Sequence, residues 1–367
     1  MFSTTAKQQG SAQQLASPVA SSSIILLSHT NQVLMQQRSA KSTSFASASV
    51  FPGGVWDEFH DGKLPNPYLE SYHKDSLAYR LCAIRELFEE SGILLARKAG
   101  TAGDLTAGDL LVLPAQERDE ARKAIYSNKI SFTDWLDSVG GEALQKNLQP
   151  FTRWVTPAAQ RKRFTTQMYI YMLPLSRPST ATNTAEAELQ ADSVLATPDG
   201  TEVSTSAFED AATWLSQMKS GDIALYPPQA FLLTLISQFC EGLPPNSTTT
   251  TSSATDYYQD QRDRLTEFIR RVPTTQKPKS LEDPTSQIPW PEKVISPVNS
   301  MITDDGRYLL TLGQPGPELK STGRGGDFER VVLVRLENRR TQEVQVMDRE
   351  EAFKVLRPME QIKKVKL

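Results

Sequence analysis

The chain has 367 residues, 38% of them hydrophobic and 23% charged, which describes a globular protein with substantial loops and either one extended domain or two. With its formal net charge of −3, the chain lacks the overall positive charge that is typical of proteins that bind polyanions. Its two cysteines exclude a disulfide framework, and no apolar run approaches the roughly 18 to 20 residues that span a bilayer.

The N-terminal part of the chain predicts a tail and then a hairpin. Residues 1–20 are mostly Ser, Gln, Ala and Thr, and we expect them to be disordered. The tail has no acid, as in a mitochondrial presequence, but it lacks the arginines that such a presequence usually carries. Residues 23–27 and 33–38 have the length and apolar content of two strands, and the polar turn between them predicts a β-hairpin.

A Pro-Gly-Gly sequence ends at Gly54, where the backbone is free to turn tightly and to approach a ligand closely. The segment 56–75 is polar and aromatic and contains two prolines, so it has the character of an inserted loop. Asp75 or Ser76 can then cap the N-terminus of a helix. The sequence therefore predicts a loop, an insertion and a helix in this order.

Three carboxylates, on Glu86, Glu89 and Glu90, follow on this helix at positions i, i+3 and i+4. This spacing places them on one helix face, where like charges repel each other unless a cation lies between them. Carboxylate oxygens are the ligands that Mg²⁺ and Mn²⁺ prefer. Gly92 is well placed to end the helix in a left-handed conformation. The stretch therefore predicts a metal-binding helix.

The middle of the chain alternates helical and strand patterns. Residues 116–127 and 132–147 predict a small helical subdomain, whereas 151–157 and 167–172 predict strands. The basic cluster 161–163 lies between these strands. It is either a solvated loop or, if it faces the acidic helix, a site for phosphates.

The last third of the chain changes character twice. A strand at 202–208 and helices that start near 210 and 227 come first. Residues 243–290 are then low in complexity and rich in proline, which is typical of a linker. From 291 onward, a hairpin and a further strand predict a β-rich extension.

Residues 85–93 match every fixed position in the second half of the Nudix box, G-x5-E-x7-R-E-U-x-E-E-x-G-U, in which U is aliphatic. The chain thus resembles Nudix hydrolases. The box has 14 positions from its first Gly to its Arg, but Gly54 and Arg85 are 31 apart, so about 17 residues are inserted. Counted back from Arg85, the first Glu of the box falls on Leu77, which is not acidic.

A narrower resemblance covers roughly residues 22–240. The Arg38-Ser39 pair, the Phe-Pro-Gly-Gly sequence and the stretch 154–166 are similar to a Nudix branch that contains peroxisomal coenzyme A diphosphatases. Thr165 departs from this pattern, which has an acidic or amide residue there. The branch also has members without an assigned substrate, so the resemblance does not fix the substrate.

The resemblance implies an α/β fold, the Nudix α/β/α sandwich with a mixed sheet. An inserted loop, a small helical insertion and a β-rich C-terminal extension would be added to it. We divide the chain into four parts on this basis. They are a disordered tail at 1–20, a Nudix hydrolase domain at 21–242, a linker at 243–290 and the extension at 291–367.

The resemblance also implies the chemistry, which is metal-dependent hydrolysis of a nucleoside diphosphate linked to another group. Glu86, Glu89 and Glu90 would hold Mg²⁺ or Mn²⁺, with Glu89 and Glu90 counted as catalytic. Arg85 would pair with a helix acid and hold its side chain in place.

The same resemblance suggests roles for residues outside the helix. Gly54 would let the loop approach the ion or a phosphate, and Arg38 and Arg163 are candidate contacts for the phosphates of the substrate. Glu202 is our candidate for the general base, with Glu209 as the fallback.

The resemblance favours coenzyme A or acyl-CoA as the substrate, giving 3′,5′-ADP and a phosphopantetheine. ADP-ribose, a dinucleotide or a nucleotide cap are alternatives, and a non-catalytic nucleotide-sensing or scaffold protein is the alternative of another class. We expect no specific nucleic acid partner and no membrane span. The sequence does not determine the oligomeric state.

The last residues bear on localisation. Residues 364–367, Lys-Val-Lys-Leu, are similar to a peroxisomal tripeptide signal in their basic residue and terminal Leu, although a small residue is expected where Val365 stands. We therefore expect a peroxisomal location and an import receptor as partner, with the cytoplasm or the mitochondrion as alternatives.

Overall fold

The computed structural model describes residues 17–39, 47–101, 110–175, 197, 203–243, 251–337 and 340–359. The fold is built on a mixed eight-stranded sheet in the order β10-β7-β8-β1-β2-β3, with β4 added to β1 and β9 to β2. The β1–β8 and β10–β7 pairs are parallel. The strands of this sheet are β1 (Val19–Leu27), β2 (Val33–Arg38), β3 (Ser49–Val50), β4 (Gly53–Val55), β7 (Gln149–Val155), β8 (Phe164–Met172), β9 (Val203–Glu209) and β10 (Val294–Ile295).

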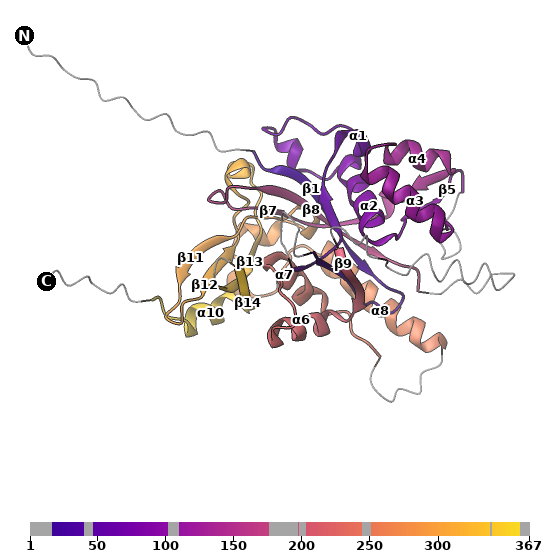
Figure 1. Cartoon of the computed structure of the whole chain (residues 1–367). Helices are drawn as coiled ribbons and strands as arrows, with labels where there is room; N and C mark the ends of the chain where they lie inside the picture. Colours follow the sequence, from indigo (N-terminus) through magenta and orange to yellow (C-terminus); the bar gives the residue numbers. More distant parts are fainter. Residues whose placement is uncertain are drawn as a thin grey trace, which may run out of the picture.

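Helices cover both faces of this sheet (Figure 1). Alternate residues of β1 point to opposite faces, so Ile24 belongs to one core with Phe88 of α2, while Ile25 belongs to another with Phe231 of α7. This is the predicted α/β/α sandwich with a mixed sheet. One face carries α2 (Leu77–Ser91), α3 (Ala115–Tyr126) and α4 (Phe132–Ser138), and the other carries α6 (Ala211–Ser220), α7 (Pro227–Ile236) and α8 (Thr251–Arg270).

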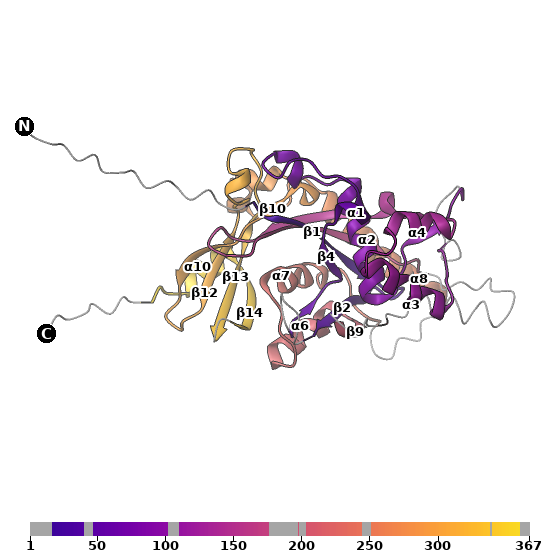
Figure 2. The same ribbon diagram turned by 45° about the horizontal axis from the view of Figure 1, so that its top comes forward.

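The C-terminal part of the chain forms the predicted additional sheet, in the order β11-β12-β13-β14. Figure 2 shows this sheet beside α7, and its strand β14 contacts that helix. The elements of this part are β11 (Val298–Ile302), β12 (Tyr308–Leu312), β13 (Asp327–Glu337), β14 (Arg340–Asp348) and α10 (Arg349–Val355).

Shorter elements lie elsewhere in the chain. They are α1 (Glu58–Asp61), η1 (Glu70–His73), β5 (Ala96–Lys98), β6 (Gly141–Ala143), η3 (Gln145–Asn147), α9 (Pro278–Leu281), η4 (Pro284–Gln287), η5 (Trp290–Glu292) and η6 (Pro317–Leu319).

The C-terminal part is also tied into the main sheet. Strand β10 pairs with β7, and Val294 lies opposite Arg153. Trp290, which is fully buried, lies with its ring centroid 5.6 Å from that of Phe151 and 5.3 Å from that of Phe268. The residues around 290 therefore complete the core of the sandwich.

Two segments differ from the sequence prediction. The predicted linker contains α8, a 20-residue helix whose buried side chains Leu265, Phe268 and Ile269 recur at helical spacing. The predicted helix at 132–147 ends at Ser138, because Gly140 has a φ of 66° and the chain then enters β6. The proposed division into four parts stays a prediction.

The remaining strands and helices named in the sequence prediction are present within four residues of their expected limits, with the strand-like run 93–96 reduced to the short β5. The inserted loop 56–75 contains α1 and η1. Within the described ranges, no helix combines the length and the apolar content that crossing a membrane needs.

Candidate active site

Helix α2 begins and ends where its sequence indicates. The Ser76 hydroxyl accepts a hydrogen bond from the Tyr79 N–H, and Gly92, with a φ of 74°, donates its N–H to the Phe88 carbonyl at 2.8 Å. At the same end, Arg122 of α3 donates to the Glu89 carbonyl from Nε at 2.9 Å and from Nη2 at 2.7 Å. A cation on the last carbonyls stabilises the helix end that carries the acids.

Arg85 is the centre of the buried polar cluster on α2. Its Nη1 donates to Glu86 Oε1 at 2.9 Å and to Glu89 Oε1 at 3.0 Å, so one nitrogen holds both carboxylates. Its other edge binds Asp61, with Nε and Nη2 each 2.9 Å from a carboxylate oxygen. Only 4% of Arg85 is exposed. Its contacts are those of a residue that positions the acids, as the resemblance implies.

Asp61 is the residue that sequence reasoning missed. Counting back from Arg85 placed the first acid of the box at Leu77, but that side chain is 60% exposed. Counting forward from Gly54 instead reaches the expected position at residue 60, one before Asp61. The insertion therefore lies mainly between this acid and the helix, and Asp61 reaches Arg85 from α1. A count from both ends of the box was the signal that could have found it.

The surroundings of Glu86 change its pKa. Burial, together with the Glu89 and Asp61 charges, raises the pKa of Glu86 to about 7 against the opposing charge of Arg85. A carboxyl group in this setting gains from an added positive charge.

The Gly-Gly loop lies directly against the acids. The Gly53 N–H donates to Glu90 Oε2 at 2.9 Å, and Arg38 Nη1 donates to Glu90 Oε1 at 3.3 Å. A Cβ added to Gly54 would lie 2.4 Å from Glu86 Oε2. A side chain at Gly54 would therefore displace the Glu86 carboxylate or β4, so glycine allows this approach of β4 to the helix, whereas the approach of Gly54 to an ion or a phosphate stays a prediction.

The acids fit a divalent metal ion in their chemistry more clearly than in their arrangement. Glu86 and Glu89 share one Arg85 nitrogen, whereas the Glu90 carboxylate binds Gly53 and Arg38. Among the residues that the structure describes, no group of three or more His, Cys, Asp or Glu side chains is arranged to hold a metal. All three side chains nevertheless offer carboxylate oxygens, which are the donors that Mg²⁺ and Mn²⁺ take.

Other predicted site residues are not brought to the acids in the same way. Arg163 forms an ion pair with Glu318 and donates from Nε to the Thr156 carbonyl at 3.1 Å, so it joins the β7–β8 connection to the C-terminal part. Its role as a phosphate contact stays a prediction. Thr165 lies on β8 and is fully buried.

The two candidates for the general base have different outcomes. Glu202 lies outside the described residues. Glu209 pairs with Val33 at one end of β2, whereas Arg38 pairs with Val203 at the other. Five residues of strand separate Val33 from Arg38, roughly 17 Å, so the register disfavours Glu209 as a base near Glu90.

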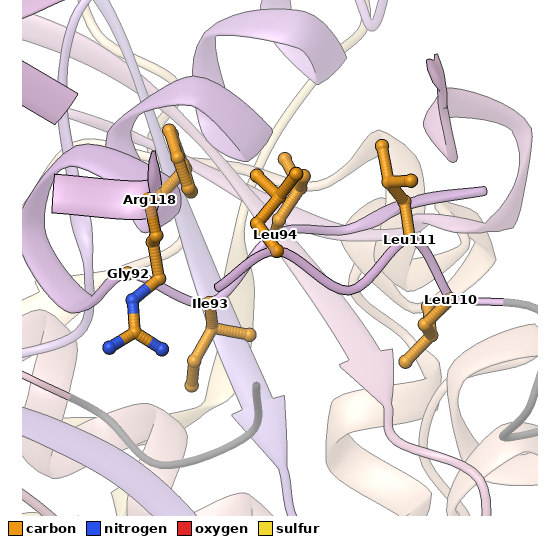
Figure 3. A pocket seen from close by; sticks show the side chains of 8 residues that line it. Gly92, Ile93, Leu94, Leu110, Leu111 and Arg118 are labelled. Atoms are coloured by element: carbon orange, nitrogen blue, oxygen red, sulfur yellow. The ribbon is translucent and has the colours of Figure 1, made fainter. Parts of the chain in front are cut away.

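A small apolar cavity lies next to the end of α2 (Figure 3). Figure 3 shows Leu94, Leu110 and Leu111 on one side of it and Gly92 with Arg118 on the other. Its volume of about 10 Å³ is near the lower limit for a single water molecule, so it holds no substrate. A wider cleft of about 540 Å³ lies between α8 and β13, and neither space is lined by the acids of α2.

Comparisons with known proteins find similar sequences. Residues 63–235 match the family profile described as NUDT19 Nudix domain. The acyl-coenzyme A diphosphatase NUDT19 of Gallus gallus is 26% identical over 290 residues, which cover 66% of this chain and 68% of that protein. A Caenorhabditis elegans protein named nudix hydrolase 7 is 28% identical over 219 residues, 60% of each chain.

Among solved structures, a Nudix hydrolase from Alicyclobacillus acidocaldarius aligns with 59% of this chain and 90% of its own, with 19% identity and a TM-score of 0.43. The Nudix family generally uses divalent metal ions. From the matched profile, the two relatives and the arginine-centred acids of α2, we conclude that residues 63–235 are similar to the Nudix domain of Nudix hydrolases, which supports a pyrophosphohydrolase, and that the chain resembles the acyl-coenzyme A diphosphatase branch.

Proposed function

We propose that the chain hydrolyses the diphosphate of coenzyme A or acyl-CoA, giving 3′,5′-ADP and the corresponding phosphopantetheine. The observation that carries the reaction class is the single Arg85 nitrogen that holds Glu86 and Glu89, with Asp61 fixing the other edge of the guanidinium. The choice of coenzyme A is supported by the relative that is named as an acyl-coenzyme A diphosphatase.

The chemical problem is that a polyanionic substrate repels the carboxylates around it. A Mg²⁺ or Mn²⁺ ion held by Glu86, Glu89 and Glu90 would neutralise phosphate charge and lower the pKa of water. Arg85 holds two of these carboxylates in fixed positions, so the site loses little conformational entropy when the substrate binds.

Hydrolysis forms one bond from a water oxygen to phosphorus and breaks the bond between that phosphorus and the bridging oxygen. The water loses its protons, and the departing phosphate leaves with the bridging oxygen. Glu202 remains our candidate for the base that takes the first proton. Arg38, which donates to Glu90 at 3.3 Å, connects β2 to the acid helix at the point where the phosphates would arrive.

The test is turnover of a substrate panel by the full chain in the presence of Mg²⁺ or Mn²⁺. We expect coenzyme A and acyl-CoA to release 3′,5′-ADP, detected by chromatography, faster than ADP-ribose, a dinucleotide or a cap analogue is cleaved. Glu89→Gln should lower the rate at least about 100-fold, whereas Glu117→Gln, an exposed acid of α3, should leave it unchanged. Inert coenzyme A beside active ADP-ribose would reject the proposed substrate and keep the reaction class.

A nucleotide-sensing or scaffold function is the alternative of another class. It predicts no turnover of any panel member, with nucleotide binding that is insensitive to Glu89→Gln. The complete set of three acids on α2 favours the enzyme. Peroxisomal location stays a prediction, because residues 364–367 lie outside the described part of the chain.

A further inference from the structure

Arg153 is a buried cation that forms no ion pair with an acid in the part of the chain that the structure describes. It lies on β7, has no exposed surface, and its guanidinium lies 4.4 Å from the centroid of the Tyr79 ring of α2. Its Nη1 donates to Thr165 Oγ1 at 3.2 Å. Among the described residues, neither Nε nor Nη2 of Arg153 has a hydrogen-bond partner. Burying a charged group whose donors lack acceptors costs free energy, so we expect an acceptor at the Nε–Nη2 edge of the guanidinium.

That edge has a defined preference. Nε and Nη2 present two parallel N–H groups, which is the arrangement that binds a negatively charged acceptor. In the same protein, Arg85 uses these two nitrogens to bind both oxygens of Asp61 at 2.9 Å each. Burial raises the pKa of Tyr79, to about 12, against the charge of Arg153 and a side-chain hydrogen bond between Arg153 and the Tyr79 hydroxyl, which both lower it. A tyrosine hydroxyl supplies no negative charge at neutral pH.

His73 adds a third unmet donor beside the same Thr165 hydroxyl. It is 1% exposed, and its Nδ1 lies 3.0 Å from the same Thr165 hydroxyl that accepts from Arg153. Because an arginine only donates, the Thr165 proton is available to Nδ1, and the neutral ring then carries its hydrogen on Nε2. This Nε2 is buried and has no partner within the described ranges.

The surrounding charge is positive. Arg324 donates from Nη1 to the His73 carbonyl at 2.8 Å, and Arg163 pairs with Glu318 nearby. The guanidinium groups of Arg153, Arg324 and Arg163 act on His73 against the carboxylate of Glu318, while Glu292 and Glu70 act on Arg324. A positive potential in a water-poor interior favours an anion strongly.

We propose that Arg153 and His73 bind a small monovalent anion of halide size, such as chloride, beneath the N-terminal end of α2. A water molecule fits less well, since its two hydrogens need acceptors and the unmet groups are all donors. The burial of both side chains excludes a substrate phosphate. Tyr79 precedes Glu86 by seven residues, roughly 10 Å along the helix, so the site is separate from the catalytic acids.

The first test measures thermal unfolding of the full chain in sodium chloride and in sodium gluconate at equal ionic strength. We expect the melting temperature to rise by about 2 to 4 °C for each tenfold increase of chloride above its dissociation constant, and to stay constant in gluconate, whose anion is too large. In a crystal soaked with bromide, an anomalous peak should lie within hydrogen-bond distance of Arg153 Nε. Equal melting in both salts, or a peak-free site that refines as water, overturns the proposal.

Two variants locate the effect. Arg153→Met should abolish the chloride dependence, and Thr165→Asp should abolish it too, because a carboxylate beside Nη1 would neutralise the Arg153 charge that attracts the anion. Thr165→Asp should also melt in gluconate as high as the parent does in chloride, which keeps the test valid if Arg153→Met fails to fold. Arg349→Met is the matched control, since it removes an arginine 4.1 Å from the Phe328 ring centroid and should keep the chloride dependence. Chloride dependence that survives in Thr165→Asp contradicts the site.

Discussion

Asp61 binds Arg85 through two hydrogen bonds of 2.9 Å, although the two residues are 24 positions apart in the sequence. The Asp61 side chain has no exposed surface, and that of Arg85 is 5% exposed. The pair anchors helix α2 to the segment that follows the Gly-Gly loop. It thus fixes the position of the nitrogen that holds Glu86 and Glu89.

Asp61→Asn should therefore be among the most damaging changes outside the acid triplet. Removing one partner of a buried ion pair leaves a buried charge and costs about 3–5 kcal/mol. Urea unfolding should show this loss, and turnover should fall at least about tenfold because Arg85 loses its orientation.

The control for this prediction is Glu58→Gln, which changes an exposed acid on the same short helix. The double variant Asp61→Asn with Leu77→Glu should remain as impaired as Asp61→Asn alone, since Leu77 faces solvent. Restored turnover in the double variant would show that the first acid of the box belongs at position 77.

Local features of this fold were predictable and non-local ones were not. The caps of α2 and the spacing of its acids are encoded within a few residues, so Ser76 and Gly92 could be assigned from the sequence. The pairing of Asp61 with Arg85 depends on where an insertion is placed, and a one-ended count placed it wrongly. The tertiary contact with Arg85 is what identifies Asp61 as the acid of the cluster.

The same limit explains Arg153 and α8. In the sequence, Arg153 is one polar residue of a strand, and only the neighbouring strand and helix show that it is buried. Helix α8 is mainly polar, and its few apolar side chains are buried in the same core as those of α7. The composition of 243–290 predicted a linker because composition does not show which face is covered.

Gly54→Ala tests the approach of the loop to the acids. The added Cβ would lie 2.4 Å from Glu86 Oε2, so either the carboxylate or β4 must move. We expect turnover to fall at least about tenfold while circular dichroism stays that of the parent, since a small shift of a reacting group suffices for such a loss. Gly313→Ala is the control, because its nearest atom, Phe328 Cδ2, is 4.0 Å away. Equal turnover in the two variants would mean that Gly54 is not needed at the site.

Arg38→Met separates two roles of this arginine. If it holds Glu90, to which it donates at 3.3 Å, kcat should fall about tenfold with KM unchanged, in line with the loss of one charged hydrogen bond. If it contacts substrate phosphates instead, KM should rise with little change in kcat. We expect the fall in kcat, partial recovery in Arg38→Lys, and parent-like kinetics in Gln37→Met, which changes the exposed neighbour.

His73 should make folding stability depend on pH. Burial and then the charge of Arg153 lower the pKa of His73 from 6.5 to about 4. Between these values the unfolded state binds the proton and the folded state does not, so stability present above pH 6.5 is lost as the pH falls toward 4. The full contribution is about 3 kcal/mol.

The measurement is urea unfolding of the parent and of His73→Asn at several pH values from 4 to 7. Gluconate is the salt to use, because a bound anion would favour the charged ring. The difference in unfolding free energy between the two proteins should change across this range. Parallel curves for the two proteins would contradict the assigned shift.

Trp290→Ala tests whether the C-terminal part is a separable extension or a part of the core. The fully buried ring lies within 6.2 Å, centroid to centroid, of Phe151, Phe231 and Phe268, which come from β7, α7 and α8. Its removal should cost about 3–5 kcal/mol. Val298→Ala, at a position 44% exposed on β11, should cost less than about 0.5 kcal/mol.

Truncation before residue 290 extends the same test, since it removes Trp290 together with β10. Strand β7 would lose its partner at Arg153 and Trp154, and the core would lose its largest fully buried side chain. We expect the truncated chain to show no cooperative unfolding transition. A truncated chain that unfolds cooperatively with parent-like circular dichroism would instead show that residues 291–367 form a separate unit, because the sandwich would then be complete without them.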